Sequence, residues 1–128
     1  MIFSKTLAWV WVAAYAGFIF YLSSLSHPVP AELTFLEKYH IDWIFHVIEY
    51  AFFGWLLMRA MGVTFSGRPV LALAVMAFLI GALYALSDEW HQSFVPNRES
   101  SAFDFMADTA GIFCGVRFKL KKGFQRNA

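Results

Sequence analysis

The sequence predicts an all-α integral membrane protein, a four-helix bundle with both termini in the cytoplasm. Of its 128 residues, 59% are hydrophobic and only 15% are charged, whereas about a quarter of an ordinary soluble domain is charged. A soluble domain of this length has too little interior to bury so much apolar surface. In addition, four stretches are long and apolar enough to span a membrane, and the basic residues are unevenly distributed around them.

The first two predicted spans are residues 7–25 and 43–62. A helix needs about 20 mainly apolar residues to cross the hydrocarbon core of a bilayer. Residues 7–25 contain no charge at all, and residues 43–62 are apolar except for His46, Glu49 and Arg59. A lysine ahead of the first run also fits a cleaved signal peptide, but the run is long for one and further spans follow it. We therefore expect a first transmembrane helix there.

The third and fourth predicted spans are residues 69–87 and 102–120. The third is uncharged and begins at Pro69, a residue that is tolerated in the first turn of a helix. The fourth is the weakest of the four, because it has two acidic residues near its start and two basic residues near its end. We predict that the four spans form a single domain over residues 1–128.

The basic residues predict the orientation of the bundle. If both termini and the loop around Gly67 lie on one side, that side carries eight of the ten lysine and arginine residues, all except Lys38 and Arg98. Loops on the cytoplasmic side of a membrane carry an excess of these residues. Both termini are therefore predicted to be cytoplasmic. The basic C-terminal tail is expected to contact anionic lipid, and no nucleic-acid partner is expected.

Polar side chains from three spans fall near the membrane face that is predicted to be outside. They lie in the outer ends of the second and fourth spans and directly after the third. An ionisable side chain within a membrane costs roughly 3 kcal/mol or more and rarely faces lipid. We therefore predict one outward-facing polar site in the bundle. Its candidate ligand-binding residues are His46, Glu49, Tyr50, Asp88, Glu89, Gln92, Arg98, Asp104 and Asp108.

Helical spacing predicts which faces of the second and fourth spans turn inward. Residues three and four positions apart share a face of a helix. The stripe on the second span consists of His46, Glu49, Tyr50 and Phe53, and that on the fourth consists of Asp104, Asp108, Gly111 and Gly115. Glycines spaced four apart allow another helix to approach closely. The stripe with the two aspartates is therefore expected to face the bundle.

Two of these residues also have a structural interpretation. Asp104 stands three residues after Ser101 and before an apolar run, which is a capping-box arrangement. Arg98 is able to hold two carboxylates by paired hydrogen bonds and so tie its loop to the helices. For His91, a solvated helix end is the interpretation that we favour.

VanZ-like membrane proteins have two signatures that this sequence resembles. The first signature lies in the second span and has an acid, then a histidine, then a tyrosine. The stretch "IDWIFHVIEYAFFGWLL" resembles it. The second signature resembles "LYALSDEWHQSFVPNRESSAFDFMADTAGIFCG", in which an Asp-Glu pair and a glutamine precede a proline and an arginine, and spaced acids open the last helix. "YLSSLSHPVP" resembles the family's first outer loop. One departure is Trp43, where family members often carry a lysine.

The resemblance implies a small multi-pass protein of the bacterial cytoplasmic (inner) membrane and cell envelope. The family takes its name from an accessory factor for resistance to teicoplanin, a glycopeptide antibiotic. Expected partners are therefore membrane lipid and an envelope precursor or glycopeptide-related ligand.

Three functions agree with the predicted site. The first is a non-catalytic protein that binds a polar head group or a lipid-linked envelope ligand, with Arg98 as its anion contact. The second is an enzyme for hydrolysis or transfer on a lipid-linked substrate, in which His46 and Glu49 form an acid–base pair. Its catalytic candidates are His46, Glu49 and Asp108, and its candidate ligands for a divalent metal are His46, Glu49, Asp104 and Asp108. The third, an ion or proton pathway, ranks last, because the acids occupy only the outer half of the membrane.

Overall fold

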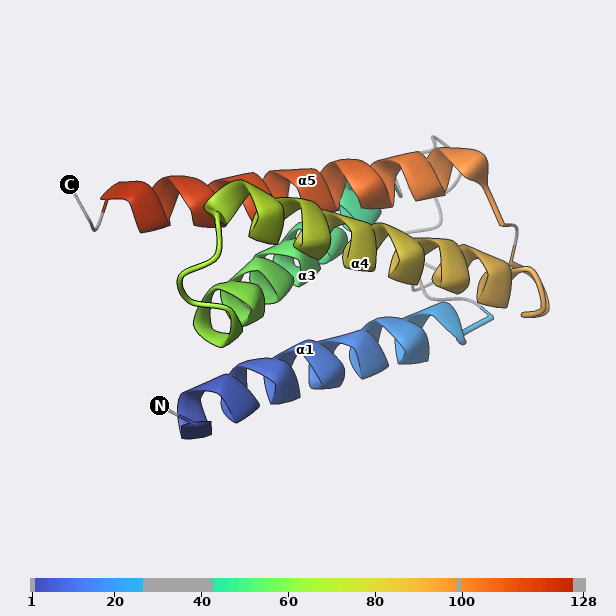
Figure 1. Ribbon diagram of the computed structural model, residues 1–128. Coiled ribbons are helices and arrows are strands. Elements are labelled where there is room, and N and C mark those ends of the chain that lie inside the picture. Colours follow the sequence, from blue (N-terminus) through green and yellow to red (C-terminus); the bar gives the residue numbers. More distant parts are fainter. Residues whose placement is uncertain (1, 27–42, 99, 126–128) are drawn as a thin grey trace.

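The computed structural model describes residues 2–26, 43–98 and 100–125, and α-helices are the regular secondary structure in these residues. The helices are α1 (Ile2–Ser23), α3 (Trp43–Thr64), α4 (Val70–Gln92) and α5 (Ala102–Gln125) (Figure 1). They run back and forth along one direction, so the predicted all-α four-helix class is confirmed. Most of the predicted first outer loop, including Lys38, lies outside the described residues.

Three of the described helices are long and apolar enough to cross a membrane. They are Lys5–Ser23 of α1, α3 and α4. The charged residues near both ends of α5 make it the least apolar of the four, and its membrane crossing stays a prediction. Large apolar side chains cover the outside of the bundle, among them Leu71 and Leu83, which are 72% and 67% exposed. Such an apolar surface is suited to contact with lipid.

Helix α4 extends five residues beyond the predicted end of its span, from Ser87 to Gln92. Hydropathy marks where a chain stops being apolar, not where its helix ends. The polar residues of the last turn continue the helix because three of them, Asp88, Glu89 and Gln92, are buried and turn into the bundle. They therefore project from a regular helix and not from a loop.

The two ends of the bundle differ in charge. The start of α1, the end of α3, the start of α4 and the end of α5 share one end, which we call the basic end (Figure 1). There Trp9 Nε1 donates a hydrogen bond to Thr64 Oγ1 (2.9 Å), and Lys5 Nζ donates one to the Thr64 carbonyl oxygen (3.3 Å). The opposite end, where α4 finishes and α5 starts, we call the acidic end.

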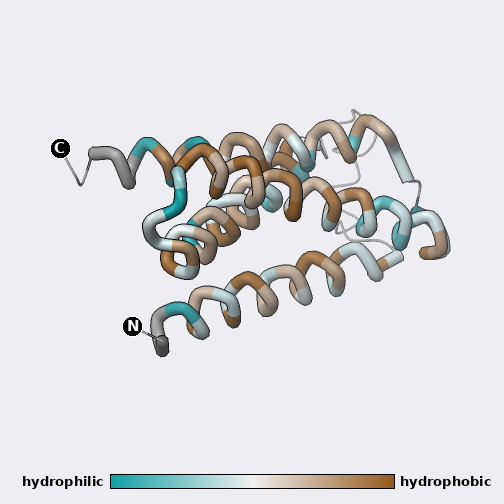
Figure 2. Tube along the Cα trace, in the orientation of Figure 1, coloured by the Kyte–Doolittle hydropathy of each residue, from teal (hydrophilic) through white to brown (hydrophobic). Residues whose placement is uncertain are grey.

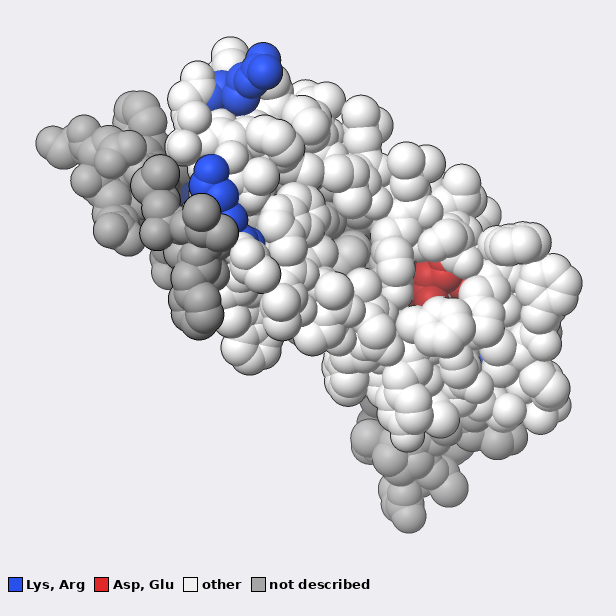
Figure 3. Space-filling model, turned by 60° about the horizontal axis from the view of Figure 1, so that its bottom comes forward, with Lys and Arg blue, Asp and Glu red and all other residues white. Residues whose placement is uncertain are grey.

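Figures 2 and 3 show this division along the bundle. In Figure 2, hydrophilic segments lie toward the two ends and hydrophobic ones between them. In the face shown in Figure 3, the large basic groups lie toward the basic end, whereas acidic atoms are visible only toward the other end. The structure thus places the start of α1 and the end of α5 at the basic end. The side of the membrane that this end faces stays a prediction.

Helix α3 is the central element, because it makes the most extensive contacts with the other three helices, above all with α5. In its contact with α5, the two backbones approach closely at glycines. A Cβ atom added to Gly54 would lie 2.5 Å from the Ile112 carbonyl oxygen, and one added to Gly111 or Gly115 would overlap the backbone of α3. The predicted close approach along the glycine stripe is therefore confirmed. It brings the start of α5 against the start of α3, where the polar residues lie.

Candidate functional site

Polar side chains at the acidic end form two clusters. The aspartate cluster comprises Tyr50 of α3 with Asp88 and Gln92 of α4. The histidine cluster comprises His46 of α3, Glu89 of α4 and Asp108 of α5. Adjacent residues of an α-helix point about 100° apart. The neighbouring acids Asp88 and Glu89 therefore serve different clusters.

The aspartate cluster is deeply buried. The Tyr50 hydroxyl donates a hydrogen bond to Asp88 Oδ2 over 3.1 Å, and Gln92 Nε2 donates to the same oxygen over 3.0 Å. These three side chains are at most 4% exposed. The other oxygen, Asp88 Oδ1, is buried and has no hydrogen-bond partner among the described residues. Leaving a buried acceptor unpaired costs about 1–3 kcal/mol. A ligand that donates a hydrogen bond to this oxygen would remove that cost.

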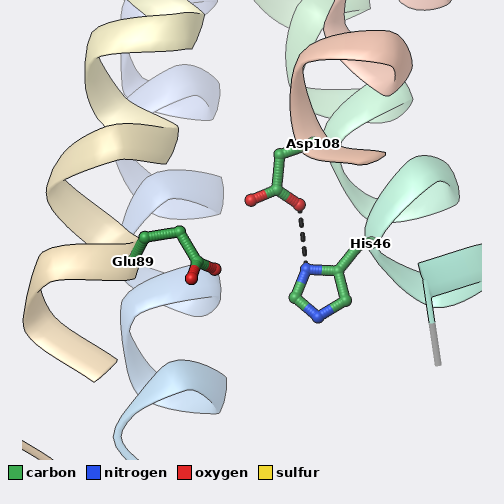
Figure 4. Close-up of side chains that lie close together, drawn as sticks. All are labelled: His46, Glu89 and Asp108. Atoms are coloured by element: carbon green, nitrogen blue, oxygen red, sulfur yellow. Dashed lines mark hydrogen bonds and ion pairs between the residues drawn. The ribbon is translucent and has the colours of Figure 1, made fainter. Parts of the chain in front are cut away.

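The histidine cluster joins three helices. His46 Nδ1 and Asp108 Oδ1 lie 2.9 Å apart, and Asp108 is fully buried. Glu89 extends from α4 toward the same space (Figure 4). One ligand atom from each of the three residues lies within 4.8 Å of the others. Asp108 Oδ2 and Glu89 Oε1 have no partner among the described residues.

Glu89 is oriented by the start of α5. Its Oε2 accepts a hydrogen bond from the backbone N–H of Ser101 (2.9 Å), while the Ser101 hydroxyl accepts one from the N–H of Phe103 (3.1 Å). These are the two contacts of a helix N-cap. In the predicted capping box, Asp104 was the acid that accepts a hydrogen bond from the Ser101 N–H. In the structure, the Ser101 N–H donates instead to Glu89 of α4. Asp104 is partly buried one turn before Asp108 and interacts electrostatically with His46.

The predicted acid–base pairing of His46 with Glu49 differs from the hydrogen bonding in the structure. The predicted partner of His46 was Glu49 on the same helix, but its hydrogen-bonding partner is Asp108 on α5. Glu49 Oε1 is instead buried without a partner among the described residues. The reason is that the close α3–α5 contact places Asp108 directly beside His46.

Arg98 does not hold two carboxylates in the described part of the chain. Its Nη2 donates a hydrogen bond to the carbonyl oxygen of Leu22 (3.3 Å), at the end of α1. Its Nε is buried without a partner among the described residues. It lies near enough to Glu49 for an electrostatic attraction, although no ion pair within 4.0 Å joins them. Arg98 thus ties the loop to α1, and not to the acids that the structure describes.

A family comparison agrees with the sequence motifs. The sequence pattern of the VanZ/LLP1 family matches residues 4–120. The chain belongs to this family. The searches of curated proteins and of solved structures found no match.

The VanZ/LLP1 match spans nearly the whole chain and confirms the resemblance that the motifs indicated. The two motifs that carried the resemblance are brought together in the fold, since His46 and Tyr50 come from the first, and Asp88, Glu89 and Asp108 come from the second. Membership, together with three helices able to span a bilayer, makes this VanZ/LLP1 chain a membrane protein.

A hollow of about 250 Å³ leads from the surface toward the aspartate cluster of this VanZ/LLP1 protein. It lies between α1 and α4, and its lining residues are Phe20, Tyr84, Ser87, Asp88, Trp90 and His91. Asp88 is the acid among them. The His91 ring stacks on Phe20, with centroids 4.5 Å apart, and its Nε2 lies 3.1 Å from Ser24 Oγ. His91, for which a solvated helix end was favoured, is therefore half-buried against α1.

Sequence reasoning missed the place of Glu89 beside His46 and Asp108, since the predicted metal ligands included Glu49 and Asp104 instead. A signal for it exists in α4. Small residues at four-residue intervals, Ala77, Gly81 and Ala85, are buried, and Gly81 lies against Ile112 of α5. Continuing this stripe by four residues reaches Glu89. The lining of the hollow was also missed, because it depends on how α1 packs.

Proposed function

We propose that this protein binds, without catalysis, the polar head group of a membrane lipid or of a lipid-linked envelope precursor at the acidic end of its bundle. One observation carries the proposal: Asp88 is only 4% exposed and retains an unpartnered oxygen, yet it lines a hollow that opens between α1 and α4. A carboxylate in this setting requires a donor, and the opening faces the lipid side of two membrane-spanning helices.

The chemistry of the hollow indicates the class of head group. An acceptor such as Asp88 pairs with an ammonium or hydroxyl group of the ligand. Phe20 and Trp90 line the hollow, and tryptophan is typical of the region where lipid head groups meet the hydrocarbon core. The hollow has a volume of about 250 Å³ and opens to the surface, so in the proposed complex it receives the head group while the acyl chains stay in the bilayer.

Arg98 supplies the complementary charge in the proposed complex. Its Nε has no partner among the described residues, and guanidinium groups bind phosphate well. Its bond to Leu22 places it at the same end of α1 as the hollow. The best ligand is therefore a head group with a phosphate and a hydrogen-bond-donating amine or hydroxyl. The link to envelope precursors and to teicoplanin resistance comes from the family, and the outer position of the site is the prediction of the positive-inside rule.

The first test compares two lipids of equal charge. Phosphatidylethanolamine has an ammonium group with N–H donors, whereas phosphatidylcholine has none. Native mass spectrometry of the full chain in detergent is expected to detect one retained phosphatidylethanolamine and weaker retention of phosphatidylcholine. Asp88→Asn is expected to weaken phosphatidylethanolamine binding tenfold or more. Glu89→Gln, on the adjacent residue outside the hollow, is the matched control and should bind normally. Equal retention of both lipids, or equal binding by both variants, would contradict the proposal.

The second test concerns the side of the membrane. Cys114 is the only cysteine, so a Cys114→Ala background allows single cysteines to be placed at Ser93, at the acidic end, and at Ser66, in the loop at the basic end. In intact cells, a membrane-impermeant maleimide is expected to label Ser93→Cys and not Ser66→Cys. The reverse pattern would place the site in the cytoplasm and end the proposed role in the envelope.

A second candidate function is favoured by one contact. His46 and Asp108 form an oriented imidazole–carboxylate pair at 2.9 Å, which is the arrangement of a general base and its orienting acid. An enzyme of this kind would hydrolyse or transfer a group on a lipid-linked substrate. Turnover of a radiolabelled lipid by the purified chain, lost in His46→Gln and retained in His91→Gln, would favour this function over binding alone.

A further inference from the structure

We infer that the histidine cluster is a binding site for a divalent transition-metal ion of the zinc or manganese class, with His46, Glu89 and Asp108 as its protein ligands. This inference does not depend on lipid binding at Asp88, because that residue belongs to the other cluster and the two sets of residues do not overlap.

The three ligands already lie close to one another. They come from α3, α4 and α5, and Figure 4 shows both carboxyl groups and the imidazole ring around a common space. One ligand atom from each lies within 4.8 Å of the other two, and the closest pair, His46 Nδ1 and Asp108 Oδ1, is 2.9 Å apart. A tetrahedral zinc with bonds of about 2.0–2.1 Å holds its nitrogen and oxygen ligands about 3.4 Å apart. Side-chain adjustments of about 1 Å therefore suffice.

Unpartnered atoms point to a ligand at this position. Asp108 is 0% exposed and Glu89 is 4% exposed, and each retains one buried oxygen without a partner among the described residues. Two such carboxylates in one buried space are costly unless they bind a cation. A metal ion bound between them gives both orphaned oxygens a partner at once.

The local charge also favours a divalent cation. The two carboxylates carry a charge of −2 when ionised, and a divalent ion with a neutral imidazole cancels it. None of the described lysines and arginines forms an ion pair with Glu89 or Asp108, and the ion-pair contact of Asp108 is with His46. Arg98, the one arginine or lysine described at this end, donates its hydrogen bond to a backbone carbonyl instead. Glu49 and Asp104 interact electrostatically with His46 and add to the negative potential.

The ligand set favours zinc or manganese over magnesium or calcium. Imidazole suits zinc and other transition metals, whereas sites for magnesium and calcium use oxygen ligands alone. Glu89 also has the outer partner that metal ligands usually have, since the Ser101 N–H holds its Oε2 at 2.9 Å. Three protein ligands leave a coordination position open. The His46 side chain is 14% exposed, so an ion can enter from the acidic end.

The test measures zinc binding to the full chain purified in detergent with a purification tag that lacks histidine. After treatment with a chelator and dialysis, the protein is titrated with Zn²⁺, and bound zinc is counted by mass spectrometry of the metal. One zinc per chain is expected, with a higher unfolding temperature when zinc is present. Glu89→Gln should weaken zinc binding tenfold or more, while its amide oxygen still accepts the hydrogen bond from Ser101.

A control separates this site from the rest of the acidic end. His91→Gln changes a neighbouring histidine outside the cluster and should bind zinc like the unmodified chain. If Glu89→Gln does not accumulate, His46→Gln replaces it in the comparison, because His46 is partly exposed. The inference is overturned if the chain binds less than one zinc, or if the cluster variants and the control bind zinc equally well. Loss of zinc binding with normal lipid binding leaves the proposed head-group function intact.

Discussion

The contact between α3 and α5 and the contact between α1 and α4 are built in opposite ways. In the first, Gly54, Gly111 and Gly115 let the two backbones touch. In the second, the helices meet through side chains: the Tyr84 hydroxyl donates to the Ala16 carbonyl oxygen, and His91 packs on Phe20. The first contact holds His46 beside Asp108, whereas the second leaves a hollow beside Asp88.

The α3–α5 contact is therefore the more rigid of the two, and the α1–α4 contact is the more accessible. A glycine-lined contact leaves no room for side-chain rearrangement, so the atoms on either side of it keep their spacing, as a metal site or an acid–base pair requires. A contact through a few polar and aromatic side chains is easier to open. The tight contact therefore suits the histidine cluster, and the looser one suits entry of a head group to the aspartate cluster.

The largest expected effect comes from filling the tight contact. Gly111→Leu places a side chain where the carbonyl oxygen of Val47 already lies. Because backbone must move to accommodate it, we expect a loss of stability of about 3 kcal/mol or more. Immunoblotting of the membrane fraction should detect little protein. Gly17→Leu is the matched control, since a Cβ atom there meets nothing within 4 Å, and normal accumulation of both variants would disprove the backbone contact.

A smaller effect is expected from loosening α1 against α4. Tyr84→Phe removes the hydroxyl that donates to the Ala16 carbonyl oxygen. Hydrogen bonds between membrane helices contribute about 0.6 kcal/mol on average, so the variant should accumulate and unfold at a slightly lower temperature in detergent. Tyr21→Phe, at a tyrosine that is 60% exposed, should show no change. A loss as large as that from Gly111→Leu would mean that the two contacts are equally important.

The smallest effect is expected at the end of α1. Ser24→Ala removes the hydroxyl near His91 Nε2, but the site is exposed, and the His91–Phe20 stack is retained. We expect a change in stability within about 0.5 kcal/mol, measured by thermal unfolding beside Tyr84→Phe. A larger loss of stability than that from Tyr84→Phe would show that the end of α1 is held firmly against α4. The hollow would then be less accessible than its lining suggests.

Local patterns predicted much of the site as well as the fold. The four-residue spacing of Gly111 and Gly115 was sufficient to predict a close helix contact, because periodicity along one helix defines its faces. The same periodicity could not identify the partner of His46. That partner, Asp108, lies 62 residues away, and only the crossing of α3 and α5 brings the two together.

The sequence by itself determined that the chain is helical, that it belongs in a membrane and that its acids gather toward one end, because composition and periodicity are properties of single segments. The tertiary structure alone decided that Asp88 pairs with Tyr50 and Gln92, that Glu89 joins His46 and Asp108, and that Arg98 bonds to Leu22. These pairings depend on the rotation and depth of each helix against its neighbours. Rotation and depth are set by packing between helices, such as the fit of Gly81 against Ile112, and not by any one segment.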